Sequence, residues 1–379
     1  MQNNIFFYIW RKKRIIIPVL LIIVFAVTCI IIINREKNKV YKKYEIISEK
    51  KFESISSARY ESFKDGIIRY DGDGLSFYRD GKEVFNKAFQ MSSPILDVRG
   101  TYIVVADRNT TNICLINGSG KGYDITATCA VVGVTVSKKG VVAAILDDGT
   151  ANYIELYDKN GDRLVSGRTV VEGDGYPVSI SISDDSNKLV ASYLSISEGQ
   201  AHSKVVFYNY SSVGKNEVDR IVGGFNQYDD TLVPKVKFID NNTVAAFGDN
   251  RFSIYDIDEK PKLVYETKLK EEIESVFHNE KNIGIVFKSN SQKYNHLLKV
   301  YDLKGNEECA IKINFDFSGI KFADENVVMN DKTRCMMYSF SGKQRFNKEI
   351  GTDIADVEPV EDNVYYVVHE NKYEKIKLK

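Results

Sequence analysis

Few residues of this 379-residue chain form a pattern that would do chemistry. The segment DGDG (71–74) has carboxylates suited to a cation, but the same letters are typical of a tight turn between two strands. No G-x-S-x-G, H-E-x-x-H, phosphate-binding glycine loop or EF-hand pattern occurs. The four histidines are far apart in the sequence: His202, His278, His296 and His369. The sequence therefore predicts no catalytic residue, no metal ligand and no cofactor.

One candidate binding patch combines aromatic, acidic and amide side chains from three stretches of sequence. Its members are Asp174, Tyr176, His202, Asn226, Tyr228, Asp229 and Asp230. His202 lies in SISEGQAHSK (195–204), and Asn226, Tyr228, Asp229 and Asp230 lie in GGFNQYDDTLVP (223–234); both segments read as long connections between strands. Asp174 and Tyr176 come from a preceding connection. The alternative interpretation of these side chains is the ordinary polarity of solvated loops.

The N-terminal region predicts a membrane anchor. Residues 15–33 are 19 consecutive residues without a charge, and a helix of that length spans roughly 28 Å, close to the thickness of the bilayer hydrocarbon. A cleaved signal peptide is the alternative, but no small-residue cleavage pattern follows the stretch. We therefore expect a cytoplasmic tail (1–14), a transmembrane helix (15–33), a basic juxtamembrane stalk (34–52) and an extracytoplasmic domain (53–379). Basic residues flank the helix on both sides, so the charge rule alone does not fix this orientation.

Charge and cysteine content narrow the class of protein. Residues 1–51 contain 11 Lys or Arg and 3 Asp or Glu, which leaves 41 basic and 49 acidic residues in the remainder of the chain. A mildly acidic domain is not the composition of a nucleic-acid binder. Four of the five cysteines follow the anchor, without C-x-x-C spacing. Buried free thiols are the simpler interpretation, and disulfides are the alternative outside the cell.

A repeated phrase reveals the elements that must position any site. Seven segments share an apolar strand and mostly a following Gly turn, with a loose period of about 43 residues; examples are LSFYRDGK (75–82), IELYDKNGD (154–162) and LKVYDLKGN (298–306). Two strands precede this marker strand in each unit and one strand follows it. Four strands per repeat of this length are typical of a β-propeller blade, whose faces are buried only by stacking against neighbouring blades.

The fold class predicted is therefore all-β, a propeller of four-stranded antiparallel blades. Seven full blades fit between about 53 and 351, and an eighth is partial within 353–378. A strand from YEIISEKKF (44–52) would complete the eighth blade, so eight blades are preferred over seven. Because Trp10 is the only tryptophan, the blades lack the Trp-Asp pair of WD40 repeats and the repeated tryptophans of quinone-dependent dehydrogenases.

The N-terminal anchor and three further segments resemble an uncharacterised family of bacterial single-pass membrane proteins with a degenerate, WD40-like or quinoprotein-like propeller. The three segments are QMSSPILDV (90–98), the unit from GYPVSISIS to VVFYNYSSVGKNEVDRIVGGF (175–225) and DTLVPKVKF (230–238). The resemblance extends over most of residues 50–379. It implies the anchor and the propeller, but it supplies no catalytic residue, cofactor or substrate.

The predicted function follows from the two faces of a propeller. The short Gly turns gather on one face, whereas the longer segments 195–204, 223–234 and 288–296 lie on the other, and such insertions often mark a binding side. We expect a non-enzymatic binding or scaffold module for a protein or polymer of the cell envelope. The alternative is an extracytoplasmic hydrolase that acts on glycans with carboxylates near the propeller axis.

Overall fold

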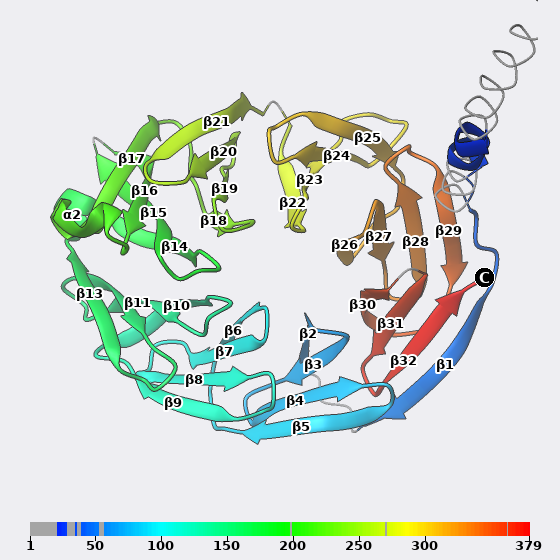
Figure 1. Ribbon diagram of the computed structural model, residues 1–379, viewed down its shortest axis with the longest axis horizontal. Coiled ribbons are helices and arrows are strands. Elements are labelled where there is room, and N and C mark those ends of the chain that lie inside the picture. The colour runs from blue at the N-terminus through cyan, green and yellow to red at the C-terminus, as the bar shows by residue number, and fades with distance from the viewer. Residues whose placement is uncertain are drawn as a thin grey trace, which may run out of the picture.

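The computed structural model describes residues 21–28, 35, 39–52, 57–197, 199–269, 271–361 and 363–379. Within these residues the chain forms eight four-stranded antiparallel sheets, arranged as the blades of one ring (Figure 1).

Each of the first seven blades uses four consecutive strands, numbered from the ring axis outwards. Blade 1 contains β2(Arg59–Phe63), β3(Gly66–Tyr70), β4(Gly74–Arg79) and β5(Lys82–Ala88), and blade 2 contains β6(Pro94–Arg99), β7(Tyr102–Asp107), β8(Asn112–Asn117) and β9(Gly122–Thr126). Blade 3 contains β10(Ala130–Val136), β11(Val142–Asp147), β12(Asn152–Tyr157) and β13(Arg163–Thr169). Blade 4 contains β14(Tyr176–Ile182), β15(Lys188–Ser197), β16(Gln200–Asn209) and β17(Ile221–Tyr228).

Blades 5 to 7 are β18(Lys235–Phe238), β19(Thr243–Phe247), β20(Arg251–Ile257), β21(Pro261–Lys268); β22(Ile273–His278), β23(Asn282–Lys288), β24(His296–Asp302), β25(Glu307–Ile313); and β26(Gly319–Ala323), β27(Asn326–Asn330), β28(Arg334–Ser339), β29(Gln344–Glu349). Blade 8 takes β30(Ile354–Glu361), β31(Val364–His369) and β32(Lys372–Leu378) from the C-terminus and β1(Tyr44–Lys51) from the N-terminus.

Burial explains why the chain stacks its blades. The second strands are almost wholly apolar and buried, as in β7 and β31, whereas the fourth strands β5 and β13 alternate between exposed and partly buried positions. The buried hydrophobic side chains fall into eight clusters, and each cluster joins two neighbouring blades, including blade 8 with blade 1. The hydrophobic contacts between blades therefore continue around the whole ring.

The repeated phrase forms the same turn in different blades. In blade 6 the Asp302 carboxylate accepts hydrogen bonds from the backbone N–H groups of Lys304 and Asn306 at 2.9 and 2.8 Å. In blade 3 Asp158 accepts the equivalent pair. Gly305 takes a φ of +86°, which a residue with a Cβ rarely adopts. The phrase is therefore a structural turn between the third and fourth strands.

The ring has eight blades, as predicted, because β1 pairs antiparallel with β32 from Tyr44–Leu378 to Lys51–Lys372. The residues before β1 are also fixed to the ring. The Lys379 carbonyl accepts hydrogen bonds from the backbone N–H groups of Lys42 and Lys43 at 2.9 and 3.0 Å. The closure therefore joins the two ends of the described propeller.

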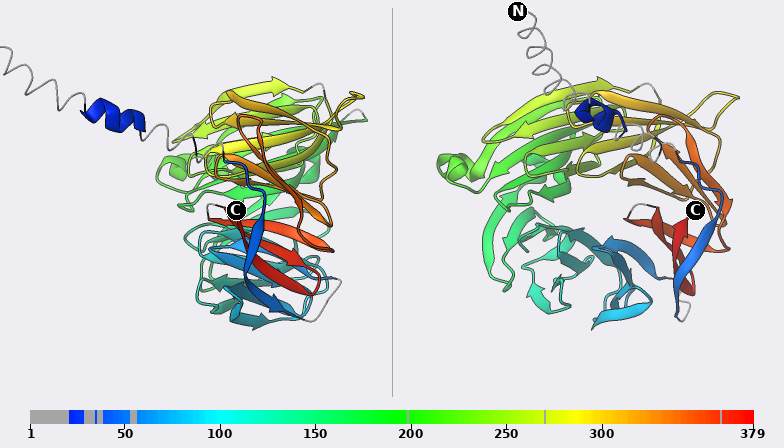
Figure 2. Two further views of the ribbon diagram at one scale, coloured as in Figure 1. Left: turned by 90° about the vertical axis from the view of Figure 1, so that its right-hand side faces the viewer. Right: turned by 45° about the vertical axis from the view of Figure 1, so that its right-hand side comes forward.

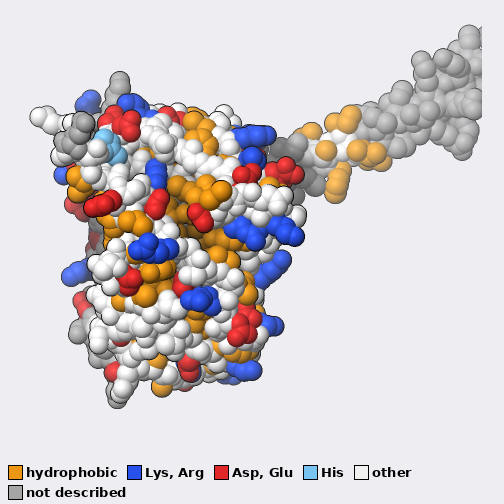
Figure 3. Space-filling view, turned by 90° about the vertical axis from the view of Figure 1, so that its left-hand side faces the viewer, with side chains coloured by type: hydrophobic (Ala, Val, Ile, Leu, Met, Phe, Trp, Pro, Cys, Tyr) orange, Lys and Arg blue, Asp and Glu red, His pale blue; other side chains and the backbone are white. Residues whose placement is uncertain are grey.

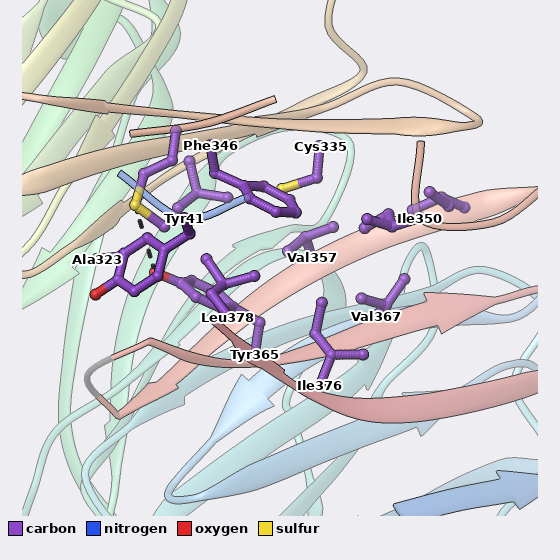
Figure 4. Packing of buried hydrophobic residues seen from close by; sticks show 13 residues of the cluster. Tyr41, Ala323, Cys335, Phe346, Ile350, Val357, Tyr365, Val367, Ile376 and Leu378 are labelled. Carbon is purple, nitrogen blue, oxygen red and sulfur yellow. Dashed lines mark hydrogen bonds between the residues drawn. The ribbon is translucent and has the colours of Figure 1, made fainter. Parts of the chain in front are cut away.

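Tyr41 forms a latch between the incoming chain and blades 7 and 8. Its side chain is 4% exposed and belongs to the cluster that includes Phe346 and Leu378 (Figure 4). The Arg345 guanidinium lies over the Tyr41 ring at 5.2 Å, and its Nε donates to the Lys39 carbonyl at 2.9 Å. A cation packed on an aromatic face is stabilising, and here it also fixes the path of the chain.

The latch defines which face of the ring the N-terminal segment approaches. In each of blades 1 to 7 the first strand turns into the second, and the third into the fourth, on one face, which we call the turn face. The opposite face, with the connections from second to third strand and from blade to blade, is the loop face. Because β1 is a fourth strand, its start lies on the turn face, and Figure 2 shows the described N-terminal helix on that side.

Of the predicted anchor 15–33, the structure describes residues 21–28, which are helical. The rest of the anchor and the predicted tail 1–14 lie outside the described residues. No helix within the described part of the chain is both long enough and apolar enough to cross a membrane.

The four described cysteines are all free. Cys114 and Cys335 are buried, while Cys129 and Cys309 are partly buried. Burial raises the pKa of Cys114 and Cys335 to about 12 and that of Cys309 to about 11, so these thiols stay protonated near neutral pH. They pack as small hydrophobic side chains, as the simpler sequence interpretation has it.

Candidate functional site

The long connections expected on the loop face of blade 4 are mostly strand. Residues 195–197 belong to β15 and residues 200–204 to β16; the two strands pair out to Ser197–Gln200 and form a projecting hairpin. Residues 223–228 belong to β17, so the join between blades 4 and 5 is only 229–234. The segment 289–295 does connect two strands, β23 and β24.

Two of the predicted patch residues have structural roles. Tyr228 is fully buried, and its hydroxyl donates to Ser253 Oγ at 2.9 Å and also bonds the Tyr255 hydroxyl. Asp230 is exposed and forms ion pairs with Arg251 and Lys268 at 3.3 and 3.1 Å. Tyr228 was placed in a loop because β17 was expected to end earlier.

The remaining members of the patch do not converge. Asp174 accepts a hydrogen bond from the Val170 N–H at 2.9 Å within α2(Val171–Asp174). The Tyr176 hydroxyl donates to Asp147 at 3.4 Å, and Asn226 is exposed on β17. Only His202 and Asp229 approach one another, with Nδ1 and Oδ1 3.9 Å apart. The structure therefore does not assemble the predicted aromatic–acidic patch.

The loop face of blade 4 instead exposes apolar side chains. Ile196, near the tip of the hairpin, is 78% exposed, and four further residues on this face are 37–47% exposed: Val170, Val171, Val178 and Leu232. Figure 3, which looks onto the left-hand edge of Figure 1, shows further hydrophobic side chains among charged ones on the outer edge. A strongly exposed apolar side chain on a projecting hairpin is a candidate contact for another protein.

A second candidate site lies on the ring axis, where the ends of the inner strands enclose a cavity of about 410 Å³. Its lining comes from β2, β6, β18, β22, β26 and β30, and from Asn279 in the turn after β22. Because these are the carboxyl-terminal halves of first strands, the cavity lies toward the turn face. Its charged residues include Glu61, Asp97, Lys237, Lys321 and Glu358.

Asp97 links three blades across the axis. Its Oδ1 accepts from Lys237 Nζ of blade 5 at 3.1 Å, and its Oδ2 accepts from Thr135 Oγ1 and the Val136 N–H of blade 3 at 2.8 and 2.9 Å. Burial alone would raise the pKa of Asp97, but the lysine and the hydrogen bonds outweigh burial and lower it. Asp97 is therefore an ionised structural group.

A chain of ion pairs braces the axis closer to the turn face. Asp184 of blade 4 accepts from Arg99 Nε of blade 2 at 2.6 Å and lies 2.9 Å from Lys138 Nζ of blade 3. Lys138 also reaches Glu280 of blade 6 at 2.9 Å. The turns of blades 2, 3, 4 and 6 are thereby joined across the ring.

On the opposite side of the cavity, one lysine serves two carboxylates. Lys321 of blade 7 pairs with Asp356 and Glu358 of blade 8, and Ser62 of blade 1 donates to Glu358. Burial beside Asp356 raises the pKa of Glu358 to about 8, although Lys321 opposes the shift. Burial also raises the pKa of Glu61, which has no ion-pair partner within 4 Å among the described residues. This side of the cavity has excess negative charge.

His278 lines the cavity as a neutral imidazole. Burial, followed by the charges of Lys237, Lys235 and Arg99, lowers its pKa to about 3, and Asp97 only partly offsets them. The folded protein therefore leaves His278 unprotonated at pH values where the unfolded chain, with a histidine pKa of 6.5, takes up a proton. His278 makes the fold lose stability as the pH falls from about 6.5 towards 3.

We expect His278→Gln to reduce this acid sensitivity. The difference in melting temperature between pH 7 and pH 4 should be smaller for the variant than for the wild-type protein, measured by circular dichroism. His202→Gln, on the hairpin of blade 4, is the matched control and should leave the difference unchanged. Equal acid sensitivity of the wild-type protein and His278→Gln would contradict the assignment.

The comparisons with known proteins place the chain in a family. The model of the family of unknown function DUF5711 matches residues 37–378. The chain belongs to DUF5711. This finding agrees with the resemblance to an uncharacterised propeller family. No curated protein matches the chain.

Solved structures resemble this DUF5711 chain in fold. BamB from Moraxella catarrhalis aligns with a TM-score of 0.55 and 9% identity, covering 88% of this chain and 100% of that one. Sqt1 from Saccharomyces cerevisiae gives 0.58 and 11%, covering 90% and 99%, and apo AztD from Citrobacter koseri gives 0.51 and 11%, covering 78% and 87%. At these identities the likeness shows a shared propeller fold and nothing of function.

The axial residues of the DUF5711 chain were missed by sequence reasoning, although they leave a signal. Inner strands such as PILDVRG (94–100), PKVKFID (234–240) and GIKFAD (319–324) have a charged residue between apolar ones. Alternation on a strand places such a residue on the face opposite the apolar ones. Sequence spacing does not reveal which blades meet across the axis.

The axis also bears on the hydrolase alternative. Two carboxylates that line the cavity, Asp97 and Glu358, are each bound by a lysine. Among the described residues, Glu61 is the lining carboxylate without such a partner. Acid–base hydrolysis of a glycoside requires a pair of available carboxyl groups, so the geometry supports binding better than hydrolysis. The described residues contain no cluster of three or more His, Cys, Asp or Glu that would hold a metal ion.

Proposed function

We propose that this chain is a membrane-anchored, extracytoplasmic propeller that binds another protein of the cell envelope through the loop face of blade 4. The anchor proposed is 15–33. Its described part, residues 21–28, exposes Leu21, Ile22, Ile23, Val24, Phe25 and Val27 by 48–72%. The Thr28 hydroxyl donates to the Val24 carbonyl at 2.7 Å, which satisfies it without water. A helix that is apolar on every face suits the interior of a bilayer.

The position of the Tyr41 latch supports an arrangement in which the turn face of the ring is directed toward the membrane. Only five residues separate Ile33, the end of the apolar stretch, from Lys39, where the chain meets the ring. Even fully extended, this segment spans at most about 20 Å. The turn face would therefore stay close to the bilayer, next to exposed Lys42 and Lys43, which suit anionic head groups. The loop face would point away from the membrane.

The single observation that carries the proposed partner is the projecting hairpin of β15 and β16. It extends from the face opposite the latch, and Ile196 near its tip is 78% exposed. Aliphatic side chains around a two-stranded projection suit an apolar surface of a protein, whereas a glycan polymer is usually bound by aromatic and amide groups. We therefore choose a protein partner over an envelope polymer.

Blade 4 offers a matched pair of positions for the test. Ile196 lies on the loop face, and Val218, 80% exposed, lies in η2(Val218–Arg220) on the turn face. We expect a photocrosslinking residue at 196 in the full chain, in native membranes, to give a discrete adduct that the same residue at 218 does not give. Ile196→Asp, with crosslinking from neighbouring Ser195, should abolish that adduct, and Val218→Asp should not.

Identical adducts from positions 196 and 218, or an adduct that survives Ile196→Asp, would overturn the proposal. Adducts that contain only glycan would replace the protein partner by an envelope polymer. Melting temperatures of both aspartate variants show whether the ring remains folded.

Membrane orientation has its own test. A reporter that is active only outside the cytoplasm, fused after Lys379, should be active when the anchor is present. Activity of a cytoplasmic reporter at the same position would overturn the orientation while leaving the binding face untouched.

A further inference from the structure

The charges around the axial cavity are separated into two halves. Blades 1, 7 and 8 contribute the carboxylates of Glu61, Asp356 and Glu358 with a single cation, Lys321. Blades 2 and 5 face them with Lys237 and Arg99 in the lining and Lys235 beside it. Because Asp97 pairs with Lys237 and Asp184 pairs with Arg99, Lys235 leaves this half with an excess positive charge. The cavity is therefore dipolar, with an acidic half and a basic half.

At the acidic half, Glu61 is available to a ligand. It lies in the middle of β2 and is exposed to the cavity, but protein surrounds it on most sides, which raises its pKa. Lys321 is already shared by Asp356 and Glu358. A carboxylate in such a place gains from a cation brought by a ligand.

At the basic half, Lys235 is available. It is exposed at the start of β18 and alternates with Lys237 along the strand; the surrounding protein, together with the charge of Lys237, lowers its pKa. Asp97 pairs with Lys237, and Lys235 has no ion-pair partner within 4 Å among the described residues. An anionic group beside Lys235 would relieve the repulsion between the two lysines.

Apolar side chains form the rest of the wall. The rings of Phe277 and Phe322 contact one another with centroids 4.4 Å apart, and Leu96, Val98 and Pro359 also line the cavity. The volume of about 410 Å³ falls within the range of about 300–1,000 Å³ typical of small-molecule sites. A bare inorganic ion would leave this wall without a partner.

We propose that the axial cavity binds a small zwitterion, an amino acid or a short peptide, with its ammonium group at Glu61 and its carboxylate at Lys235. A ligand with only a positive charge meets the uncompensated lysine, and a ligand with only a negative charge meets the uncompensated glutamate. A zwitterion with an aliphatic side chain satisfies both ends and covers the apolar wall. This site is independent of the protein contact on the loop face.

The test uses the detergent-solubilised full chain and calorimetric titration with four probes: L-leucine, L-leucyl-L-leucine, leucinamide and N-acetyl-leucine. Leucinamide lacks the carboxylate, and N-acetyl-leucine lacks the ammonium group. We expect L-leucine or L-leucyl-L-leucine to bind at least tenfold more tightly than leucinamide and N-acetyl-leucine, each of which has only one of the two charged groups.

Two near-isosteric substitutions identify the ends. Glu61→Gln should weaken binding of the zwitterion about tenfold without weakening binding of N-acetyl-leucine. Lys235→Met should weaken binding of the zwitterion without weakening binding of leucinamide. Lys281→Met, on an exposed turn of blade 6, is the control and should change nothing.

Failure of both zwitterions to bind at millimolar concentration, equal binding of all four probes, or unchanged affinity in both variants would each overturn the proposal. Melting curves of each variant verify that the ring is intact, and Glu61→Asp provides a second substitution if Glu61→Gln does not fold.

Discussion

Deletion of residues 1–52 should abolish cooperative unfolding, whereas deletion of residues 1–38 should leave it in place. The longer deletion removes β1, the outer strand of blade 8, and leaves the edge of β32 unpaired between Tyr373 and Leu378. It also removes Tyr41 from the cluster between blades 7 and 8. Loss of a large buried aromatic side chain alone costs about 3–5 kcal/mol, and an open strand edge promotes aggregation.

Thermal denaturation followed by circular dichroism, together with gel filtration, measures this effect. Deletion of residues 1–43 is the intermediate variant: it removes the Tyr41 latch but retains β1, and we expect a lower melting temperature with a cooperative transition. If the protein without residues 1–52 melted at the temperature of the protein without residues 1–38, the ring would close without β1.

Lys321→Met should lower the free energy of unfolding by about 3–5 kcal/mol at pH 9, the usual cost of leaving a buried charge without its partner. The substitution leaves the partly buried Asp356 and the buried Glu358 without their shared cation. The loss should be smaller at pH 5, where protonation of Glu358 removes one of the two charges. Urea denaturation of the full chain at pH 5, 7 and 9 measures both values.

The double variant Lys321→Met/Glu358→Gln is the control for this mechanism and should recover much of the loss at pH 9. The sign of the pH effect follows from the pKa of Glu358, which is about 8 in the fold against 4.5 in the unfolded chain. Between these values the folded state holds a proton that the unfolded state releases, so this group lowers stability as the pH rises. A loss in Lys321→Met that is equal at pH 5 and pH 9 would show that lost packing, not charge, is responsible.

Much of the fold was predictable because short, local sequence patterns determine its strands and turns. Most marker strands end at a Gly turn, as at Tyr301 and Gly305, and each turn depends only on the residues around it. The ring-closing strand was predictable because blade 8 lacked a fourth strand within 353–378 and residues 44–52 had a suitable pattern.

The candidate sites were less predictable, since they depend on distant parts of the chain. Lys237 meets Asp97 across 140 positions, and no blade period indicates which inner strands face one another. On the loop face of blade 4, the predicted binding patch depended on whether the segments were loops or extended strands, and the sequence did not distinguish the two. Tyr228 was expected in a solvated connection, but β17 continues through it and places its hydroxyl against Ser253 in the core.

The shared eighth blade also sets the order in which the protein can reach its final form during synthesis. β1 is synthesised before the strands of the other blades and its partner β32 after them, because β1 precedes them in the chain and β32 follows them. The first strand must therefore wait, with its hydrogen-bonding edges open, while the other seven blades emerge. A nascent chain that stalls before Lys372 has all the strands of blades 1 to 7 but lacks β32, so it cannot close the ring. Synthesis of β32 thus decides whether the ring closes or the product aggregates.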